Sequence, residues 1–147
     1  MQVRRPKGWV TREAGDDAYA IAKTEPGPNG ALFVTHLPLT KLMDRAPVGV
    51  VLEDVARKLL DRFGSYRKGS SKLQWQIVDL PMAYRRDLGR AGRMVARAKA
   101  DDGIVMGYLG VVLERKRIYA VAGFWKQALG KELLPAADTM FATMTTR

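Results

Sequence analysis

The sequence predicts an α+β domain in which an antiparallel sheet of six or more strands is flanked by helices on both faces. Three observations lead to this prediction. A long β-rich stretch between Arg93 and Trp125 is divided by two tight corners, which is typical of an antiparallel meander. An amphipathic helix is predicted over residues 50–63, and a second helix closes the chain at about Met144.

Two further strands are expected before the first helix. The segment AYAIAKT at residues 18–24 is the first, and ALFVTHL at residues 31–37 is the second. Between them lies the strongest cluster of turn-forming residues in the chain, EPGPNG, whose Asn-Gly pair suits the positive φ angles of a hairpin turn. We therefore expect the two segments to pair with each other.

The predicted helix over residues 50–63 has one broad apolar stripe. Its large apolar side chains recur every four residues, at Val51, Val55, Leu59 and Phe63, with Leu52, Ala56 and Leu60 beside them. Acidic residues stand near its start and basic residues near its end, an order that complements the helix dipole. This helix is expected to cover one face of the sheet.

Four strands are expected after this helix, at residues 73–80, 93–100, 104–113 and 118–125. The last two are almost continuously apolar, so they should be central strands that are covered on both sides. The last helix is expected to begin near Leu133, or at Pro135 as its first residue.

The strand at residues 93–100 alternates between apolar and basic residues. One side carries Met94, Ala96, Ala98 and Ala100, and the other carries Arg93, Val95, Arg97 and Lys99. Because successive side chains of a strand point to opposite faces, we expect the second set to present a cationic face to solvent.

The length and composition restrict the class of protein. A chain of 147 residues forms one domain over residues 1–147. The absence of cysteine excludes thiol catalysis, disulfide bonds and cysteine-based zinc sites. No apolar run approaches the ~20 residues that span a bilayer, and the first ten residues, MQVRRPKGWV, lack the apolar core of a signal peptide.

The net charge of +10 is unevenly distributed along the chain. Residues 1–64 hold 10 Lys and Arg against 8 Asp and Glu, whereas residues 65–147 hold 15 against 7. Such a field attracts an anionic lipid surface, a nucleic acid or an acidic protein. A soluble, arginine-rich surface without a partner is the other interpretation.

The densest basic cluster is the candidate binding surface. It comprises Arg85, Arg86, Arg90, Arg93, Arg97 and Lys99, and the basic loop at residues 65–72 is a second candidate. Arginine and lysine on one strand face could bind phosphates. Proteins that bind single-stranded nucleic acid usually have several aromatic side chains among their basic residues, on which the bases stack. Tyr84 is the only aromatic residue within this cluster. Three interpretations of the cluster therefore stay open: a solvated face without a partner, contact with an acidic protein or lipid headgroup, and nucleic-acid binding.

No residue pattern indicates catalysis. His36 is the only histidine, and its neighbours supply no partner for a base or a metal ligand. The serines at positions 65, 70 and 71 lack a Gly-X-Ser-X-Gly motif, and RKGSSK lacks the first glycine of a phosphate-binding loop. The paired aspartates at positions 16, 17, 101 and 102 are typical of turns, and the three tryptophans are expected in the core. We therefore expect a protein that is not an enzyme and has no metal or cofactor.

The chain resembles the PsbP-like family over residues 6–144. The segments that carry the resemblance are Pro6-Lys7-Gly8-Trp9, the strand Ala31–Leu37, the helix Val50–Phe63, Leu80-Pro81-Met82, the strand pair Val111–Glu114 and Ile118–Val121, and the closing Ala137–Met144. In place of the family's usual closing Ser-Phe, this chain has Met140-Phe141. The resemblance implies an αβα sandwich of the PsbP and DcrB type with a binding or assembly role. It also implies an exported or lipid-anchored location, as in many bacterial members. It transfers no functional residue, because the members share a scaffold rather than a site.

The sequence therefore favours a non-enzymatic binding or assembly module that acts through a protein-facing or membrane-facing surface. One alternative is a chaperone-like binder of a hydrophobic segment of a secreted protein, which predicts a large exposed apolar patch on one sheet face. The other alternative is a nucleic-acid-binding protein that uses the basic second half. The oligomeric state is left open.

Overall fold

The computed structural model describes residues 3–13, 18–22, 30–63, 74–79, 90–100, 103–114 and 116–145. Three strands come first, β1 (Val10–Glu13), β2 (Ala18–Ala22) and β3 (Gly30–Pro38), followed by a one-turn helix α1 (Lys41–Asp44) and the long helix α2 (Val48–Phe63). Four strands then follow, β4 (Gln76–Asp79), β5 (Arg90–Ala100), β6 (Gly103–Glu114) and β7 (Arg117–Lys126). A 3₁₀ turn at Gln127–Leu129 leads into the last helix, α3 (Gly130–Thr143).

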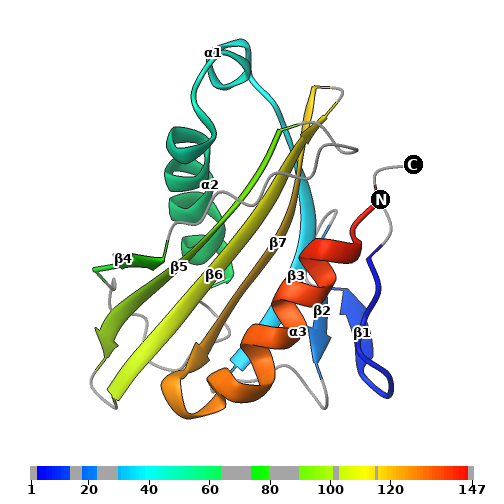
Figure 1. Ribbon diagram of the computed structural model, residues 1–147, viewed down its shortest axis with the longest axis vertical. Helices are drawn as coiled ribbons and strands as arrows, with labels where there is room; N and C mark the ends of the chain where they lie inside the picture. The colour runs from blue at the N-terminus through cyan, green and yellow to red at the C-terminus, as the bar shows by residue number, and fades with distance from the viewer. Residues whose placement is uncertain are drawn as a thin grey trace.

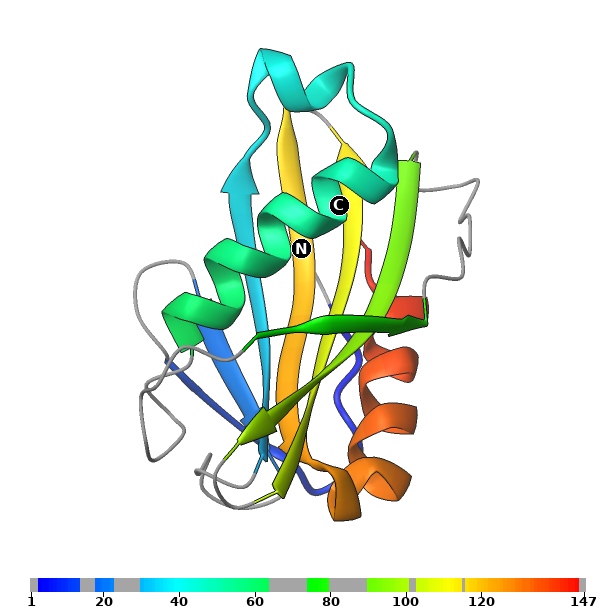
Figure 2. The ribbon, with the colours of Figure 1, turned by 90° about the vertical axis from the view of Figure 1, so that its left-hand side faces the viewer.

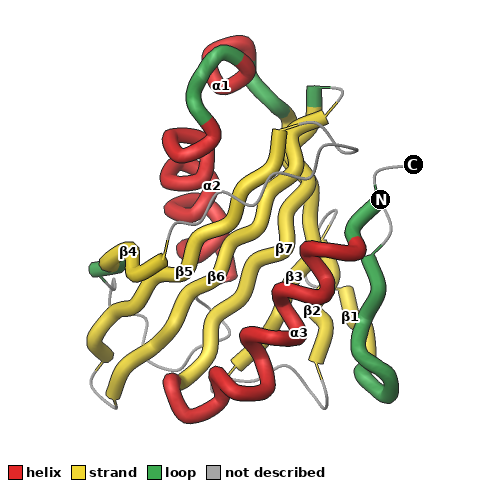
Figure 3. The backbone as a smooth tube through the Cα atoms, viewed as in Figure 1, coloured by secondary structure: helices red, strands yellow, loops and turns green. Residues whose placement is uncertain are grey.

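The strands of the described residues form one seven-stranded sheet in the order β1-β2-β3-β7-β6-β5-β4. Every neighbouring pair is antiparallel. Figure 3 shows the long strands β3, β5, β6 and β7 at the centre, with the short β1 and β4 toward the edges. The antiparallel α+β prediction is confirmed.

The first strand and the start of the last helix differ from the sequence-based prediction. Strand β1 was not predicted, because all four of its side chains are exposed and therefore show no alternation between apolar and polar residues. The last helix begins at Gly130, so Pro135 lies inside the helix and is not its first residue. The apolar periodicity after Leu133 indicated the helix but not the turn that precedes it.

The apolar stripe of α2 is buried as predicted. Its described side chains at the core are Val51, Leu52, Val55, Ala56 and Leu59, and all of them are almost inaccessible to solvent. The side chains of residues 60–63, which include the predicted Leu60 and Phe63, lie outside the described part.

The core is divided into two apolar clusters that alternate along the strands. Phe33 belongs to a cluster with the α2 side chains, whereas its neighbour Leu32 belongs to a cluster with Met140 and Phe141 of α3. Successive residues of a strand point to opposite sides of a sheet. In Figure 1 the red and orange α3 passes in front of the sheet, and in the turned view of Figure 2 the teal α2 lies on the near side.

Candidate functional site

The predicted basic cluster is centred on strand β5, and the structure gives its members different environments. Arg85 and Arg86 lie outside the described residues. Arg90, Arg93, Arg97 and Lys99 all belong to β5. The first two of these contact helices, and the last two remain exposed.

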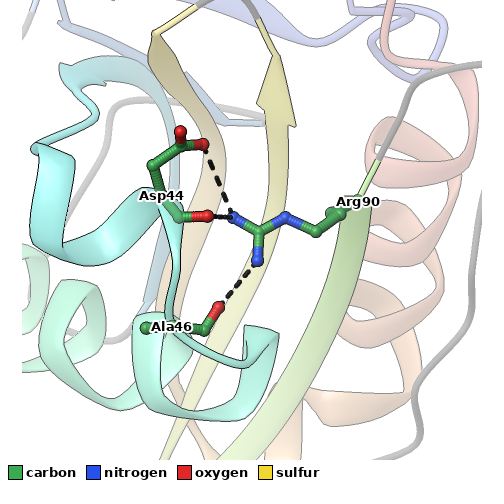
Figure 4. A network of polar contacts seen from close by, with 3 residues as sticks. All are labelled: Asp44, Ala46 and Arg90. Carbon is green, nitrogen blue, oxygen red and sulfur yellow. Dashed lines mark hydrogen bonds and ion pairs between the residues drawn. The ribbon is translucent and has the colours of Figure 1, made fainter.

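Arg90, at the start of β5, points to the corner between α1 and α2. Its Nη1 donates a 2.7 Å hydrogen bond to the carbonyl oxygen of Ala46, and its Nη2 donates a 2.8 Å bond to the carbonyl oxygen of Asp44. Nη2 also lies 3.9 Å from the carboxylate Oδ1 of Asp44 (Figure 4). Because its guanidinium is held by backbone oxygens, Arg90 is a structural clamp in this geometry.

Arg93 contacts α3. Its Nε lies 3.2 Å from Oδ1 of Asp138, and the hydroxyl of Tyr108 donates a 2.8 Å hydrogen bond to the same oxygen. Burial, and then the hydrogen bond to Asp138, raises the pKa of Tyr108 above its ordinary value. The expectation of a continuous cationic face was therefore wrong at this end of the strand, where Arg93 is partly buried and Val95 is buried in the α3 cluster.

Arg97 and Lys99, at the other end of β5, line a cavity of about 610 Å³. The described residues that line it are Gln74, Gln76, Arg97, Ala98, Lys99 and Ile104. We call this the Arg97–Lys99 cavity. Sheet register brings its residues together, because Gln76 pairs with Arg97 across β4 and β5, and Lys99 pairs with Ile104 across β5 and β6. Directly paired residues project to the same side of a sheet.

The chemistry of the Arg97–Lys99 cavity suits an anion. Two cations and two carboxamides supply hydrogen-bond donors, and no carboxylate is among the described lining residues. Half-buried Ile104 adds an apolar surface. The neighbouring edge strand β4 exposes Ile77 and Val78, at a point where the pairing with β5 shifts register.

His36 lies outside this cavity and contacts Arg117. Nη1 of Arg117 is 2.8 Å from Nδ1 of His36. Arginine can only donate, so Nδ1 accepts the hydrogen bond and the ring proton is on Nε2 in this arrangement. The ring of Tyr119 lies beside the imidazole, with centroids 6.4 Å apart. Within the described residues, no group of three or more His, Cys, Asp or Glu side chains could hold a metal ion.

The other residues singled out from the sequence have structural positions or lie outside the described part. Trp9 and Trp125 are buried in the core, and half-buried Trp75 packs on the cluster beneath α2. The loop at residues 65–72 and the four paired aspartates lie outside the described residues. Sequence reasoning missed the role of Asp138 and Asp44, because no local pattern links either residue to the arginine it contacts.

In the described part of the chain, no helix is both long and apolar enough to cross a bilayer. A second, smaller cavity of about 440 Å³ lies at the N-terminal segment and the end of α3, where Val3, Arg4, Thr143 and Thr145 line it. It contains none of the predicted site residues.

Comparison with solved structures identifies the fold. The solution structure of cyanobacterial PsbP (CyanoP) from Synechocystis sp. PCC 6803 matches with a TM-score of 0.64 and 13% identity, over 94% of this chain and 81% of that chain. PA94 from Pseudomonas aeruginosa, described as a protein of unknown function, matches with a TM-score of 0.57 and 12% identity, over 97% and 88% of the two chains. A structure from Bacteroides thetaiotaomicron VPI-5482 matches with a TM-score of 0.52 and 11% identity, over 99% of this chain but 44% of that chain. No family model and no curated protein matches the sequence. The chain therefore has a PsbP-like fold, as its sequence resemblance implied.

Proposed function

We propose that this chain, which has the PsbP-like fold, is a non-enzymatic binding module and that its Arg97–Lys99 cavity receives an acidic segment of a protein partner. The observation that supports this most is the pair of exposed cations in a cavity with no described carboxylate. Opposite charges at such a site attract a partner and fix its orientation.

The strand geometry makes the two cations a defined recognition element. Arg97 and Lys99 are two residues apart on β5, so their side chains leave the same face about 7 Å apart. A carboxylate can lie between two cations at this spacing, or two carboxylates of an extended segment can meet one cation each. Half-buried Ile104, which also lines the cavity, supplies apolar contact beside the charges, and protein interfaces combine these two kinds of surface.

We further infer that α2 and α3 cover opposite faces of the sheet, as in an αβα sandwich. The alternation of Leu32 and Phe33 between the α3 and α2 clusters supports this inference. Helix α3 then covers Arg93 and leaves Arg97 and Lys99 uncovered on the same side of β5.

The chaperone-like alternative gains no supporting observation among the described residues. The large apolar side chains that are exposed in the described part are scattered over five elements: Val10, Tyr19, Leu42, Val50, Ile77 and Val78. They do not form a patch on one sheet face, which a chaperone for a hydrophobic segment would need. Nucleic-acid binding and an exported or lipid-anchored location stay predictions.

A charge-reversal experiment tests the proposal. The double variant Arg97→Glu/Lys99→Glu is compared with Arg57→Glu/Lys131→Glu, which reverses two exposed charges on α2 and α3. Binding of a labelled peptide of alternating Glu and Ala is measured by fluorescence anisotropy. We expect about tenfold weaker binding by the first variant and wild-type binding by the control.

Two results would overturn the proposal. The first is equal peptide binding by the wild type and the Arg97→Glu/Lys99→Glu variant, because the cavity would then not be the site. The second is tighter binding of a single-stranded oligonucleotide than of the peptide at matched charge and salt, because the partner would then be a nucleic acid. Circular dichroism confirms that each variant is folded.

A further inference from the structure

A second surface lies at the opposite end of strand β5 from the Arg97–Lys99 cavity. There α1 and the corner between β6 and β7 lie at the same end of the sheet, as Figures 1 and 2 both show. The backbone N–H of Leu39 donates a 2.8 Å hydrogen bond to the carbonyl oxygen of Lys116, which joins the two segments. We call residues 39–46 with Lys116 and Arg117 the α1 tip. Strand β5 separates this tip from the cavity by about 30 Å, at about 3.3 Å for each residue.

The most exposed large apolar side chain of the described residues lies on this tip. Leu42 is 87% exposed on the four-residue helix α1, and Val50, 57% exposed, follows at the start of α2. A single exposed leucine is common on protein surfaces. Leu42 differs because the turn that carries it is fixed from two sides.

The clamp by Arg90 holds that turn in place (Figure 4). A one-turn helix is not stable alone, and the carbonyl groups at a helix end have no intrahelical partner. Arg90 binds the carbonyl of Asp44, the last residue of α1, and the carbonyl of Ala46 in the segment that follows. The contact between Leu39 and Lys116 fixes the other end of the turn. Leu42 therefore projects from a rigid support and loses little conformational freedom on binding.

The surroundings of Leu42 are basic. The exposed cations of the α1 tip are Lys41, Arg45, Lys116 and Arg117. The acids nearby in the described residues are Asp44, which faces the guanidinium of Arg90, and Glu114 at the corner. Counting Arg90, five cations thus stand against two acids. The guanidinium of Arg117 also contacts Nδ1 of His36, and an arginine side chain stays charged in proteins.

We propose that the α1 tip is a contact site for an anionic lipid bilayer. Leu42 enters the boundary between headgroups and acyl chains, and the surrounding cations meet the lipid phosphates. A bilayer surface has apolar chains beneath a phosphate layer, and this order matches one projecting aliphatic side chain surrounded by cations. A protein partner would need a pocket for Leu42 and acidic groups around it. The site uses other residues than the Arg97–Lys99 cavity, so it does not depend on the function proposed above.

Co-sedimentation with vesicles tests this proposal. The vesicles contain equal parts of phosphatidylglycerol and phosphatidylcholine, and pure phosphatidylcholine vesicles are the comparison. We expect the wild-type protein to bind the mixed vesicles at low salt and the neutral vesicles much more weakly. Leu42→Ala should weaken binding about tenfold, since most of the inserted aliphatic surface is removed. Lys41→Glu should weaken it at least about fivefold.

Matched controls keep the test specific. Val78→Ala removes an exposed apolar side chain on β4, and Lys131→Glu reverses an exposed charge on α3. Both should bind the mixed vesicles like the wild type. Leu42→Trp should bind at least as tightly as the wild type and show blue-shifted fluorescence with vesicles, as expected for an indole at the interface.

Three outcomes would overturn the proposal. Absence of wild-type binding to the mixed vesicles would do so, as would binding that Leu42→Ala leaves unchanged. The third is full competition by inorganic phosphate at the concentration of the lipid phosphate, because the tip would then be a site for a soluble anion. Loss of peptide binding at the cavity has no effect on any of these results.

Discussion

The hydroxyl of Tyr108 donates a 2.8 Å hydrogen bond to Oδ1 of Asp138, and this bond joins the central strand β6 to helix α3. Nε of Arg93 on β5 lies 3.2 Å from the same oxygen. The ring of Tyr108 is buried, and its centroid lies 6.2 Å from that of Trp125 on β7. Side chains of β5 and β6 therefore meet at one carboxylate of α3, and the ring of Tyr108 also packs beside Trp125 of β7. A hydrogen bond to a charged partner stabilises more than one between neutral groups, so this carboxylate should contribute to the attachment of α3.

We expect Tyr108→Phe to lower the free energy of unfolding by about 1–2 kcal/mol and to leave the fold unchanged. The ring packing is kept, and Asp138 keeps Arg93 and partial access to water. Urea denaturation followed by circular dichroism measures the change. Tyr19→Phe is the matched control, because Tyr19 is 46% exposed on β2 and its loss of a hydroxyl should change stability by less than about 0.5 kcal/mol. Equal effects of the two substitutions would mean that the bond to Asp138 contributes nothing.

The same phenol predicts a dependence of stability on alkaline pH. Burial raises the pKa of Tyr108 in the folded protein, so above pH ~10 the unfolded chain loses a proton that the folded chain retains. The contribution of this group is complete below pH ~10 and is lost as the pH rises, by up to about 1.4 kcal/mol per unit. The stability difference between wild type and Tyr108→Phe should therefore shrink above pH ~10. A constant difference between neutral pH and pH ~11 would contradict the assignment.

The meander and the helix α2 could be predicted because their signals are local. The runs that became β6 and β7 are long and apolar, and the stripe on α2 repeats with the helical period. The exposed strand β1 gave no such signal, since it is held in place by its pairing with β2 and not by burial of its own side chains.

The division of the basic cluster could not be predicted from the sequence. Arg93, Arg97 and Lys99 share one side of β5 and follow the same alternation. Their environments differ because α3 supplies Asp138 at Arg93 but does not extend to the other two. The partners of Arg90 lie 44 and 46 residues earlier in the chain. A tertiary contact at such a separation leaves no periodic pattern in the sequence.

Gly110 on β6 lies directly against Phe141 of α3, and we expect Gly110→Ala to destabilise the protein by about 1–3 kcal/mol. A Cβ at this position would lie 2.6 Å from the ring of Phe141, so the helix or the ring must shift. The matched control is Gly49→Ala in α2, where a Cβ meets nothing within 4 Å. That change should be neutral or stabilise the protein by up to about 1 kcal/mol, because alanine favours the helix. Thermal unfolding curves of the two variants give the comparison, and equal melting temperatures would refute the close approach.

Arg90→Lys tests whether the fork of the guanidinium holds the α1 tip. A lysine keeps the charge but cannot bind the carbonyl oxygens of Asp44 and Ala46 with the same planar pair of donors. Hydrogen–deuterium exchange should therefore become faster in the backbone amides of residues 44 and 50–51, while the amides of β6 and β7 stay protected. The free energy of global unfolding should fall by about 1 kcal/mol.

Arg57→Lys on the exposed side of α2 is the control and should change neither measurement. Unchanged exchange at these amides in Arg90→Lys would show that the turn is stable without the hydrogen bonds from Arg90. The contact between Leu39 and Lys116 alone would then hold Leu42 in position.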